Sequence, residues 1–367
     1  MQFVVVNESA GIILNITESI IENNTAVLGA GVYLVTGEES FGARVNITDS
    51  TFINNDGNTG GHFYFDTRNA TLLLDFTVTG SRFEDANVET GSAFYMLLAD
   101  GHNLSFTDTV FDNNRSGSNG GAVVLGGNSG TSDVLVNRCF FTGNRADTGG
   151  AFSINARDMG WNFEFLNSAV TRGLVAGGGF TVAGSQPSNF LFQNSTFTGN
   201  AGSSSVSLNF SGTSGTHLIL DHVTIAGNGF ARTYGALNAT ALASFTVGYS
   251  ILTDNDDRDG VNELTDNYNI VNVGTMTSLG YNILAHPVEG LTTLDTDIVG
   301  TNEVFVSADL GSAVTTDTTI YRPPNLTSPA LDAIPAEDIL LDTDQRGVAR
   351  PQNGRGDIGA VELELNQ

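Results

Sequence analysis

The stretch STFINNDGNTGGHFYF (residues 50–65) decides the fold, because versions of it recur along the chain. Each copy begins with an apolar residue, passes through Asn or Asp to Gly-Gly or Gly-Ser, and ends in a short alternating strand. The other clear copies are SIIENNTAVLGAGVYL (19–34), SRFEDANVETGSAFYM (81–96), TVFDNNRSGSNGGAVVL (109–125) and CFFTGNRADTGGAFSI (139–154). Self-similarity of this kind is typical of repeat architectures.

One apolar position marks the period of the repeat, at intervals of 27 to 31 residues. Its members are Ile21, Phe52, Phe83, Phe111, Phe141, Val170, Phe197, Ile225 and Leu252. Further alternating runs, such as TLLLDFTVTG and NFEFLNSA, lie between the copies, and no helical periodicity is present. Each repeat therefore contains about three short strands.

We predict an all-β fold, a right-handed parallel β-helix of about nine or more coils over residues 1–285. Stacked coils would place equivalent apolar residues in internal ladders. The Asn after the aromatic residue can adopt a left-handed conformation and form a polar ladder, and Gly-Gly allows the next corner to turn without a Cβ clash. A sandwich or barrel is the alternative, but neither requires such a repeat.

The charge balance excludes several functions. The 367 residues carry a formal net charge of -26, and the 14 basic residues are all Arg. Binding to nucleic acid and direct insertion at an anionic membrane are disfavoured, because both need clustered cations that this chain lacks. Lysine chemistry is excluded, because the chain contains no lysine. An acidic, lysine-free surface is suited to high salt, so we predict a saline or halophilic source.

Cys139 is the single cysteine, which rules out an intramolecular disulfide framework. It lies in the apolar run Cys-Phe-Phe and should be a buried, small apolar residue. No run of about 18 apolar residues could span a membrane. The first residues lack a basic n-region and a cleavage site, so they do not form a signal peptide. We expect an extracellular or cell-surface protein, and its leader would then be missing from this chain.

The composition changes after residue 285, where six of the seven prolines lie. We predict that residues 286–367 form a terminal irregular coil and a cap. Its arginines and carboxylates should form ion pairs that clamp loops over the open end of the solenoid, rather than a catalytic cluster. These residues are Asp332, Asp344, Arg346, Arg350, Arg355, Asp357 and Glu362.

Two segments of this region, SPALDA (328–333) and TDQRGVARPQNGRGDIGAVE (343–362), resemble the terminal signature of the choice-of-anchor Q family, and LGYNIL fits that family's last coil. The repeat itself is similar to right-handed, pectin-lyase-like β-helices of bacterial surface and secreted proteins, with elements of the polymorphic outer-membrane-protein type. The resemblance implies a β-helix followed by a surface anchor. The chain departs from the pattern in IPAEDILLD and in ending at LELNQ without an anchor.

The segment NDDRDGVNELTD (255–266) has the oxygen ligands of a calcium loop. The ligands at EF-hand-like spacing would be Asn255, Asp257, Asp259, Glu263 and Asp266. Asn at position 1 and Asp at position 12 argue against a true EF-hand. Calcium is the one cofactor that we predict, and a solvated acidic loop is the alternative.

No catalytic residue can be assigned, because no nucleophile elbow, phosphate loop or zinc motif occurs. The five histidines are scattered singly, and we expect His217 and His222 at the surface. We predict a non-enzymatic, exported structural or adhesive module that binds surface glycans or other copies of itself, by end-on or lateral contact, within a larger protein or filament. A polysaccharide lyase or glycoside hydrolase is the alternative, based on fold analogy. Ice binding would require a regular Thr-x-Thr ladder, which is lacking.

Overall fold

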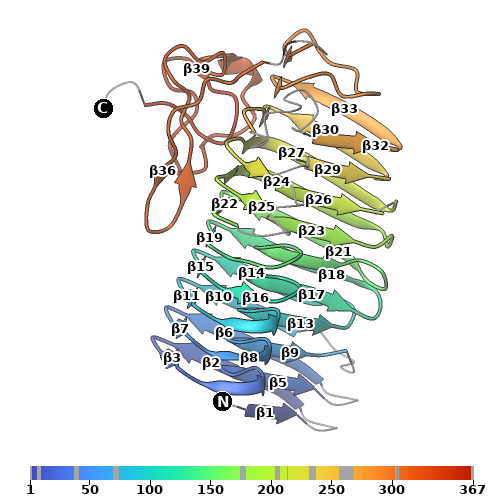
Figure 1. Cartoon of the computed structure of the whole chain (residues 1–367), viewed down its shortest axis with the longest axis vertical. Helices are drawn as coiled ribbons and strands as arrows, with labels where there is room; N and C mark the ends of the chain where they lie inside the picture. The colour runs from blue at the N-terminus through green and yellow to red at the C-terminus, as the bar shows by residue number, and fades with distance from the viewer. Residues whose placement is uncertain are drawn as a thin grey trace.

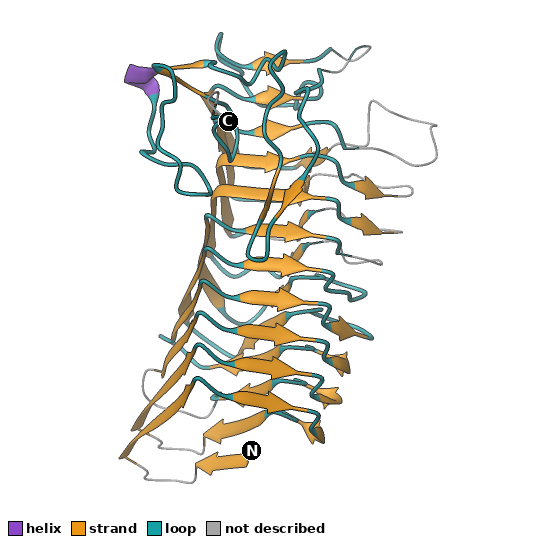
Figure 2. Ribbon diagram, turned by 90° about the vertical axis from the view of Figure 1, so that its left-hand side faces the viewer, coloured by secondary structure: helices purple, strands orange, loops and turns teal. Residues whose placement is uncertain are grey.

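The structure is a computed structural model, and it describes residues 2–5, 10–36, 41–68, 74–173, 179–202, 207–212, 214–230, 237–255, 268–301, 304 and 306–364. The chain forms a parallel β-helix, as the repeat predicted (Figure 1). Figure 2 shows equivalent strands stacked along the long axis. Within the described residues, one sheet contains ten parallel strands, which agrees with the expectation of nine or more coils.

Each coil contributes to three faces. The ten-stranded face consists of β1 (Gln2–Val5), β5 (Val32–Thr36), β9 (Phe63–Asp66), β13 (Phe94–Leu98), β17 (Val123–Gly127), β20 (Phe152–Asn155), β23 (Phe180–Ala183), β26 (Leu208–Ser211), β29 (Leu237–Thr240) and β32 (Tyr268–Val271). The long-strand face consists of β2 (Ala10–Thr17), β6 (Phe41–Thr48), β10 (Leu74–Thr79), β14 (Asn103–Thr107), β18 (Thr131–Asn137), β21 (Gly160–Leu166), the first parts of β24 (Ser188–Thr198) and β27 (Thr216–Ile225), β30 (Ser244–Gly248) and β33 (Thr275–Gly280).

The short-strand face follows the long-strand face around the next corner. It consists of β3 (Ile20–Glu22), β7 (Thr51–Ile53), β11 (Arg82–Glu84), β15 (Val110–Asp112), β19 (Phe140–Thr142), β22 (Ala169–Thr171), the last parts of β24 and β27, β31 (Ile251–Leu252), β34 (Ile283–Leu284) and β35 (Ile298–Val299). Smaller corner strands are β4 (Thr25–Leu28), β8 (Asp56–Thr59), β12 (Asn87–Thr90), β16 (Arg115–Ser116), β25 (Ala201–Gly202) and β28 (Gly229–Phe230).

The nine apolar positions that define the period are in register on the short-strand face, continuing to Leu284. Phe83, Phe111 and Phe141 stack with ring centroids 5.3 and 4.6 Å apart. Phe94 and Phe106 complete the interior through edge-to-face contacts. The predicted internal ladders are thus confirmed, and the stacked and edge-to-face rings fill the interior of these coils.

At two corners of the coil, ladders of polar side chains form hydrogen bonds with the buried backbone N–H and C=O groups. After the short strands, the first turn residue is left-handed, as at Asn113 (φ 51°), and the second is a buried asparagine. Asn114 Nδ2 donates to Asn144 Oδ1 at 3.0 Å and to the carbonyl of Phe83 at 2.8 Å. The predicted ladder of left-handed turn residues is present, since Asn54 Nδ2 donates to Asn23 Oδ1 at 2.8 Å and both residues have positive φ. The buried asparagines form a second ladder beside it, because a buried amide can satisfy the backbone of both adjacent coils.

The other corner, between the long and short strands, carries a ladder of buried hydroxyl groups. The amides of Ser50 and Ser168 donate to the Oγ atoms of Ser81 and Ser195. Cys139 takes the same position in its coil and is buried, as predicted. At the Gly-Gly corner, Gly149 has φ of +63°, and an added Cβ would lie 1.9 Å from the carbonyl oxygen of Phe152. Only glycine is compatible with this close approach.

The C-terminal segment, residues 306–364, contains antiparallel pairs β36 (Val314–Thr315) with β37 (Ile320–Tyr321) and β38 (Ile334–Pro335) with β39 (Arg355–Gly356), plus a 3-10 turn at Ala336–Asp338. Figure 1 shows it beside the later coils. It packs on the outside of the short-strand face, where Ile320 contacts Phe140 and Ile358 contacts Ile251 in small apolar clusters.

This position differs from the expected cap over the open end of the solenoid. Val288 is instead part of the main core, and the partly buried Leu291 packs against that core. The physical reason is that several outward residues of the short strands are apolar. These are Val110, Phe140, Ala169, Ile251 and Ile283. A lateral segment removes them from water.

Candidate functional site

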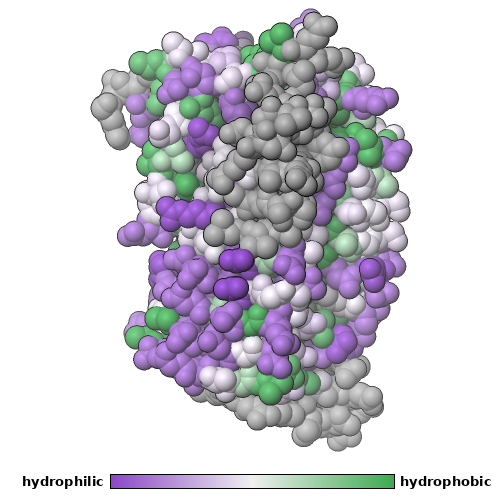
Figure 3. All heavy atoms as spheres, in the orientation of Figure 1, coloured by the Kyte–Doolittle hydropathy of each residue, from purple (hydrophilic) through white to green (hydrophobic). Residues whose placement is uncertain are grey.

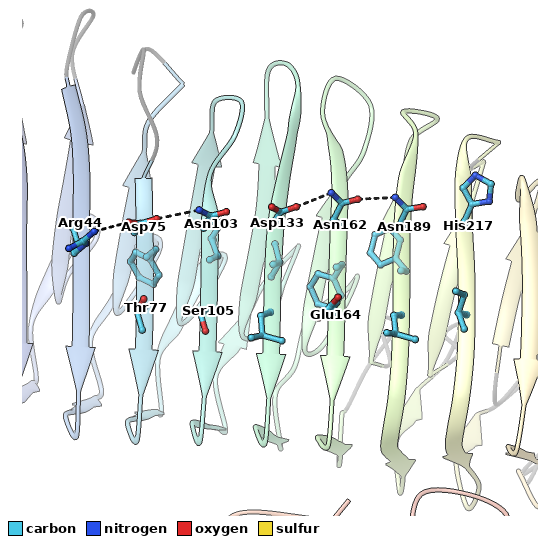
Figure 4. Close-up of a pocket in the computed structure, with 18 residues that line it drawn as sticks. Arg44, Asp75, Thr77, Asn103, Ser105, Asp133, Asn162, Glu164, Asn189 and His217 are labelled. Atoms are coloured by element: carbon cyan, nitrogen blue, oxygen red, sulfur yellow. Dashed lines mark hydrogen bonds and ion pairs between the residues drawn. The ribbon is translucent and has the colours of Figure 1, made fainter. Parts of the chain in front are cut away.

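A groove of about 770 Å³ lies on the outer surface of the long-strand face. It crosses the strands from β6 to β27, and Figure 4 shows one polar side chain from each of these strands lying side by side. At a strand spacing of about 4.8 Å, the groove extends over about 29 Å. Its volume is in the range typical of ligand sites.

Alternation along each strand creates this surface. Asp133 is exposed while Val134 is buried in β18, and Asn162 is exposed while Phe163 is buried in β21. Successive side chains of a strand point to opposite faces, so the same strands supply the core and the groove. Parallel register then repeats the pattern from coil to coil.

The first row of the groove is polar, and we call it the amide row. Its members are Arg44, Asp75, Asn103, Asp133, Asn162, Asn189 and His217. Asn162 Nδ2 donates to Asp133 Oδ1 at 2.8 Å, and Asn189 Nδ2 donates to Asn162 Oδ1 at 2.8 Å (Figure 4). These bonds orient the amides, and each keeps hydrogen-bonding capacity toward the solvent.

The second row lies two residues further along each strand. Its members are Thr77, Ser105, Leu135, Glu164, Leu191 and Ile219. It is hydroxylic at β10 and β14 and mainly apolar from β18 onward, and Ile219 is 38% exposed. The groove therefore presents hydrogen-bonding groups beside apolar surface, a combination typical of small-molecule sites.

The charges of the groove are partly neutralised. Arg44 Nη2 lies 3.1 Å from Asp75 Oδ2, while the other oxygen of Asp75 accepts a 3.3 Å bond from Asn103. Asp133 and Glu164 are the remaining carboxylates among its lining residues. This excess of carboxylates over cations favours neutral ligands and disfavours polyanions.

The predicted calcium loop lies mostly outside the described residues. Asp257, Asp259, Glu263 and Asp266 belong to the undescribed part of the chain. Asn255 is described and is buried in the asparagine ladder, where its Oδ1 accepts bonds from the backbone and side chain of Asn228. No group of three or more His, Cys, Asp or Glu side chains able to hold a metal occurs among the described residues.

The seven charged residues predicted for the cap lie in two adjoining clusters of the C-terminal segment. In the first, Arg350 Nη1 lies 3.0 Å from Glu362 Oε2, and both side chains are buried. Arg346 donates through Nε and Nη2 to Asp344 at 2.9 and 2.8 Å. The Asp344 carboxylate also accepts the backbone N–H of Glu362, so these four residues form one network.

The second cluster surrounds Asp357. Its carboxylate accepts the backbone N–H groups of Asp332 and Leu363 at 2.7 and 2.6 Å, and its own N–H donates to Glu362. Arg355 is exposed and donates to the carbonyls of Asp332 and Ala333. The side chains of both clusters thus hold loops of the segment together.

Burial dominates the electrostatics of these clusters. It raises the pKa of Asp357 to about 7, although two backbone hydrogen bonds oppose the shift. Burial also raises the pKa of Glu362 and lowers that of Arg350, while their mutual attraction opposes both shifts. Breaking a buried, hydrogen-bonded pair of this kind leaves an uncompensated charge, so the pair is important for the integrity of the segment.

His222 corrects a prediction. We expected it at the surface, but it is buried, whereas His217 is exposed as predicted. Its Nδ1 lies 2.7 Å from Asp221 Oδ1, and its ring stacks on Tyr249 at 4.6 Å. The lateral C-terminal segment brings Arg350 into electrostatic range, and burial lowers the pKa of His222. A segment more than a hundred residues away in the chain thus buries His222.

Comparisons with known protein families, with curated proteins and with solved structures found no match. Across the described part of the chain, no helix has the length and apolar character needed to cross a membrane. The face seen in Figure 3 is mainly hydrophilic, with apolar residues scattered among polar ones. The fold and the groove are therefore the basis on which function is inferred.

The members of the amide row were missed as individual site residues. A signal was present, because the outward positions of the alternating runs can be aligned by the 27 to 31 residue period. That alignment places Asp75, Asn103 and Asp133 at equivalent positions, as the register later shows. Only the structure shows which of the outer faces forms the groove, because every face is built from strands with alternating polar residues.

Proposed function

We propose that the protein is a non-enzymatic, exported surface module whose long-strand face binds an extended neutral polysaccharide. The observation that carries the proposal is the amide row, a continuous line of polar side chains in register beside a partly apolar row. A polymer with repeating hydroxyl groups can form similar contacts at each coil. Affinity then accumulates from many weak contacts along the groove.

The acidic character of the chain supports a neutral glycan over an acidic one. Only Arg44 contributes a formal cation to the groove, and it is paired with Asp75. A polyuronate would bring its charges close to Asp133 and Glu164, and like charges at such distances repel. Arabinan, xylan and glucan chains are free of this repulsion.

A direct test is affinity electrophoresis in gels that contain xylan, β-glucan, mannan or polygalacturonate. The double variant Asn162→Ala/Asn189→Ala should lose retardation by the neutral polysaccharides. The matched control is Asn209→Ala/Asn238→Ala, which removes a similar amide ladder, with a 2.7 Å bond, from the ten-stranded face. Equal retardation of the two variants and the wild type would exclude the groove as the polysaccharide-binding site.

The resemblance of residues 328–333 and 343–362 supports assignment to the choice-of-anchor Q family and to a cell-surface location. Both remain part of the proposal, as does assembly with other copies of the chain. Fractionation of cells that express the full native gene, followed by immunodetection of this chain, tests the location. Recovery only in the cytoplasm would contradict it.

A polysaccharide hydrolase is the second candidate function. Asp133 and Glu164 lie on neighbouring strands, two residues apart in register, so their Cα atoms are separated by about 8 Å. Inverting hydrolases use carboxyl groups about 6.5–9.5 Å apart, a separation within reach of two side chains whose Cα atoms lie at this distance. Both side chains are exposed on an open surface, however, where bulk water is not excluded, so binding is favoured.

Release of reducing ends from the polysaccharide that binds would distinguish the two functions. Hydrolysis that disappears in both Asp133→Asn and Glu164→Gln would establish the enzyme. Retardation in the gel without release of reducing ends would support binding without hydrolysis.

A further inference from the structure

A second pocket, of about 360 Å³, lies at the corner between the long-strand and short-strand faces. The C-terminal hairpin β36–β37 forms its other side, and its lining residues do not overlap with those of the groove. We call it the corner pocket. Its lining residues are Asp108, Val110, Arg138, Asn167, Thr316, Thr318, Thr319, Tyr321, Gln345 and Arg346.

The solenoid wall of the corner pocket is a planar ion pair. Arg138 Nε lies 2.7 Å from Asp108 Oδ1, and its Nη2 lies 2.8 Å from Oδ2. Both residues are left-handed turn residues on adjacent coils, with φ near 50°, which places their side chains side by side. Within the described residues, Arg138 Nη1 makes no hydrogen bond, so it can donate into the pocket.

The opposite wall is held firmly against the solenoid. Ile320 packs with Val110 and Phe140, and Gln345 Oε1 accepts a 2.6 Å bond from Thr196. The guanidinium of Arg346 stacks on the Tyr321 ring, 4.7 Å from its centroid. A pocket between two anchored walls is preformed, which lowers the entropic cost of binding.

The chemistry of the corner pocket suits hydroxyl groups. Arg138 is neutralised by Asp108, and Arg346 by the buried Asp344, so no uncompensated positive charge favours an anion. A hydroxyl group both donates and accepts, and the Asp108–Arg138 pair offers both functions along one edge. The hydroxyl of Thr318 adds a further partner beside the Tyr321 ring, whereas that of Thr316 is bonded within its own turn.

We propose that the corner pocket binds a single neutral sugar residue, separately from the polysaccharide groove. Its volume is near the lower end of the range for small-molecule sites, which fits one ring better than a chain. The pocket does not depend on the function proposed for the groove, because the two share no lining residue.

The test is titration of ¹⁵N-labelled protein with methyl glucoside, methyl galactoside and, as the charged analogue, glucuronate. The side-chain Nε–H of Arg138 and the amide of Asn167 report from the pocket, and those of Asn103 and Asn162 report from the groove. We expect a neutral glycoside to shift the pocket signals with a millimolar Kd. Glucuronate should bind at least about tenfold more weakly.

Variants locate the binding. Arg138→Gln and Thr318→Ala should each weaken binding, by about tenfold for Arg138→Gln, while Asn162→Ala should leave it unchanged. Thr318 is exposed, so its variant is expected to fold if Arg138→Gln does not. The proposal is overturned if no pocket signal shifts at about 100 mM glycoside, if glucuronate binds as well as the glycoside, or if the groove signals alone respond.

Discussion

His62 Nε2 lies 3.2 Å from Asn114 Oδ1, across a coil in which Ala86 occupies the position of the ladder asparagine. The other ring nitrogen, Nδ1, lies 3.1 Å from Asn55 Nδ2. An amide nitrogen can only donate, so Nδ1 accepts and Nε2 carries the proton that Asn114 receives. The imidazole thus bridges the gap that Ala86 leaves in the asparagine ladder, and this buried histidine has a structural role.

Removing the bridge should destabilise the solenoid. His62→Ala removes one hydrogen-bond partner from the Asn55 amide and one from Asn114 Oδ1 and opens a cavity, so the free energy of unfolding should fall by about 2–4 kcal/mol. The double variant His62→Ala/Ala86→Asn should recover at least half of that loss, because an asparagine is restored to the ladder. Urea unfolding measures both. A double variant less stable than His62→Ala would contradict the ladder argument.

Buried histidines should make the solenoid sensitive to acid. Burial lowers the pKa of His62 to about 3 and that of His102 to about 4, whereas an unfolded histidine titrates near 6.5. Between these values the unfolded chain binds more protons, so stability is complete above about pH 6.5 and falls as the pH falls toward 3.

Replacing one of these histidines isolates its contribution. His62→Gln keeps a donor and an acceptor at the site but does not titrate. Its free energy of unfolding should therefore depend less on pH than that of the wild type between pH 6.5 and 4. Parallel curves for the two proteins would show that His62 is not buried in its neutral form.

The Arg350–Glu362 pair should hold the C-terminal segment on the short-strand face. Glu362→Gln leaves the buried Arg350 without its counter-ion and should cost about 3 kcal/mol. Hydrogen exchange of residues 343–362 should accelerate while that of the core strands stays unchanged. The exposed pair Arg44–Asp75 is the control, since Arg44→Gln should cost less than about 1 kcal/mol.

Salt should stabilise the protein. A net charge of -26 implies repulsion among carboxylates, which dissolved ions screen. We expect the Tm to rise steadily between low salt and molar NaCl, and an equimolar sucrose series serves as the control for nonspecific effects. A Tm independent of salt would argue against a halophilic origin.

Calcium binding by residues 255–266 remains a prediction. Titration calorimetry with CaCl₂ should show binding that is lost in Asp257→Asn/Asp259→Asn. Asp254→Asn tests specificity, because Asp254 lies just outside the predicted loop and its carboxylate accepts the backbone N–H of Ala308. Absence of heat at millimolar calcium would remove the hypothesis.

The repeat copies were enough to predict the solenoid and its register. Phe52, Phe83 and Phe111 were aligned by the period alone, and they stack as aligned. The asparagine ladder was also predictable, because most repeats carry an asparagine three residues after the periodic apolar position, as at Asn55, Asn114 and Asn144. The role of His62 was not, since its significance depends on Ala86, a departure from the repeat 24 residues later in the chain.

The position of the C-terminal region could not be predicted from the sequence. Among the described residues, Arg346–Asp344 and Arg350–Glu362 form the predicted kind of ion pair, whereas Asp357 and Arg355 bond to backbone groups. The place of the segment on the lateral face was not predicted. The bond between Thr196 and Gln345 joins residues 149 positions apart, and no local pattern encodes it. The corner pocket is lined by residues of the same segment and of the solenoid, so it too depends on contacts distant in the chain.

The sequence by itself determined the parallel β-helix, the residues that fill its core and the polar ladders at its corners. This was possible because each residue of a solenoid packs against its equivalent one coil away, so the fold appears in the sequence as a regular repeat. Only the tertiary structure decided which outer face forms the groove and where the C-terminal segment lies. Those features depend on the complementarity of surfaces distant in the chain, which no periodic pattern specifies.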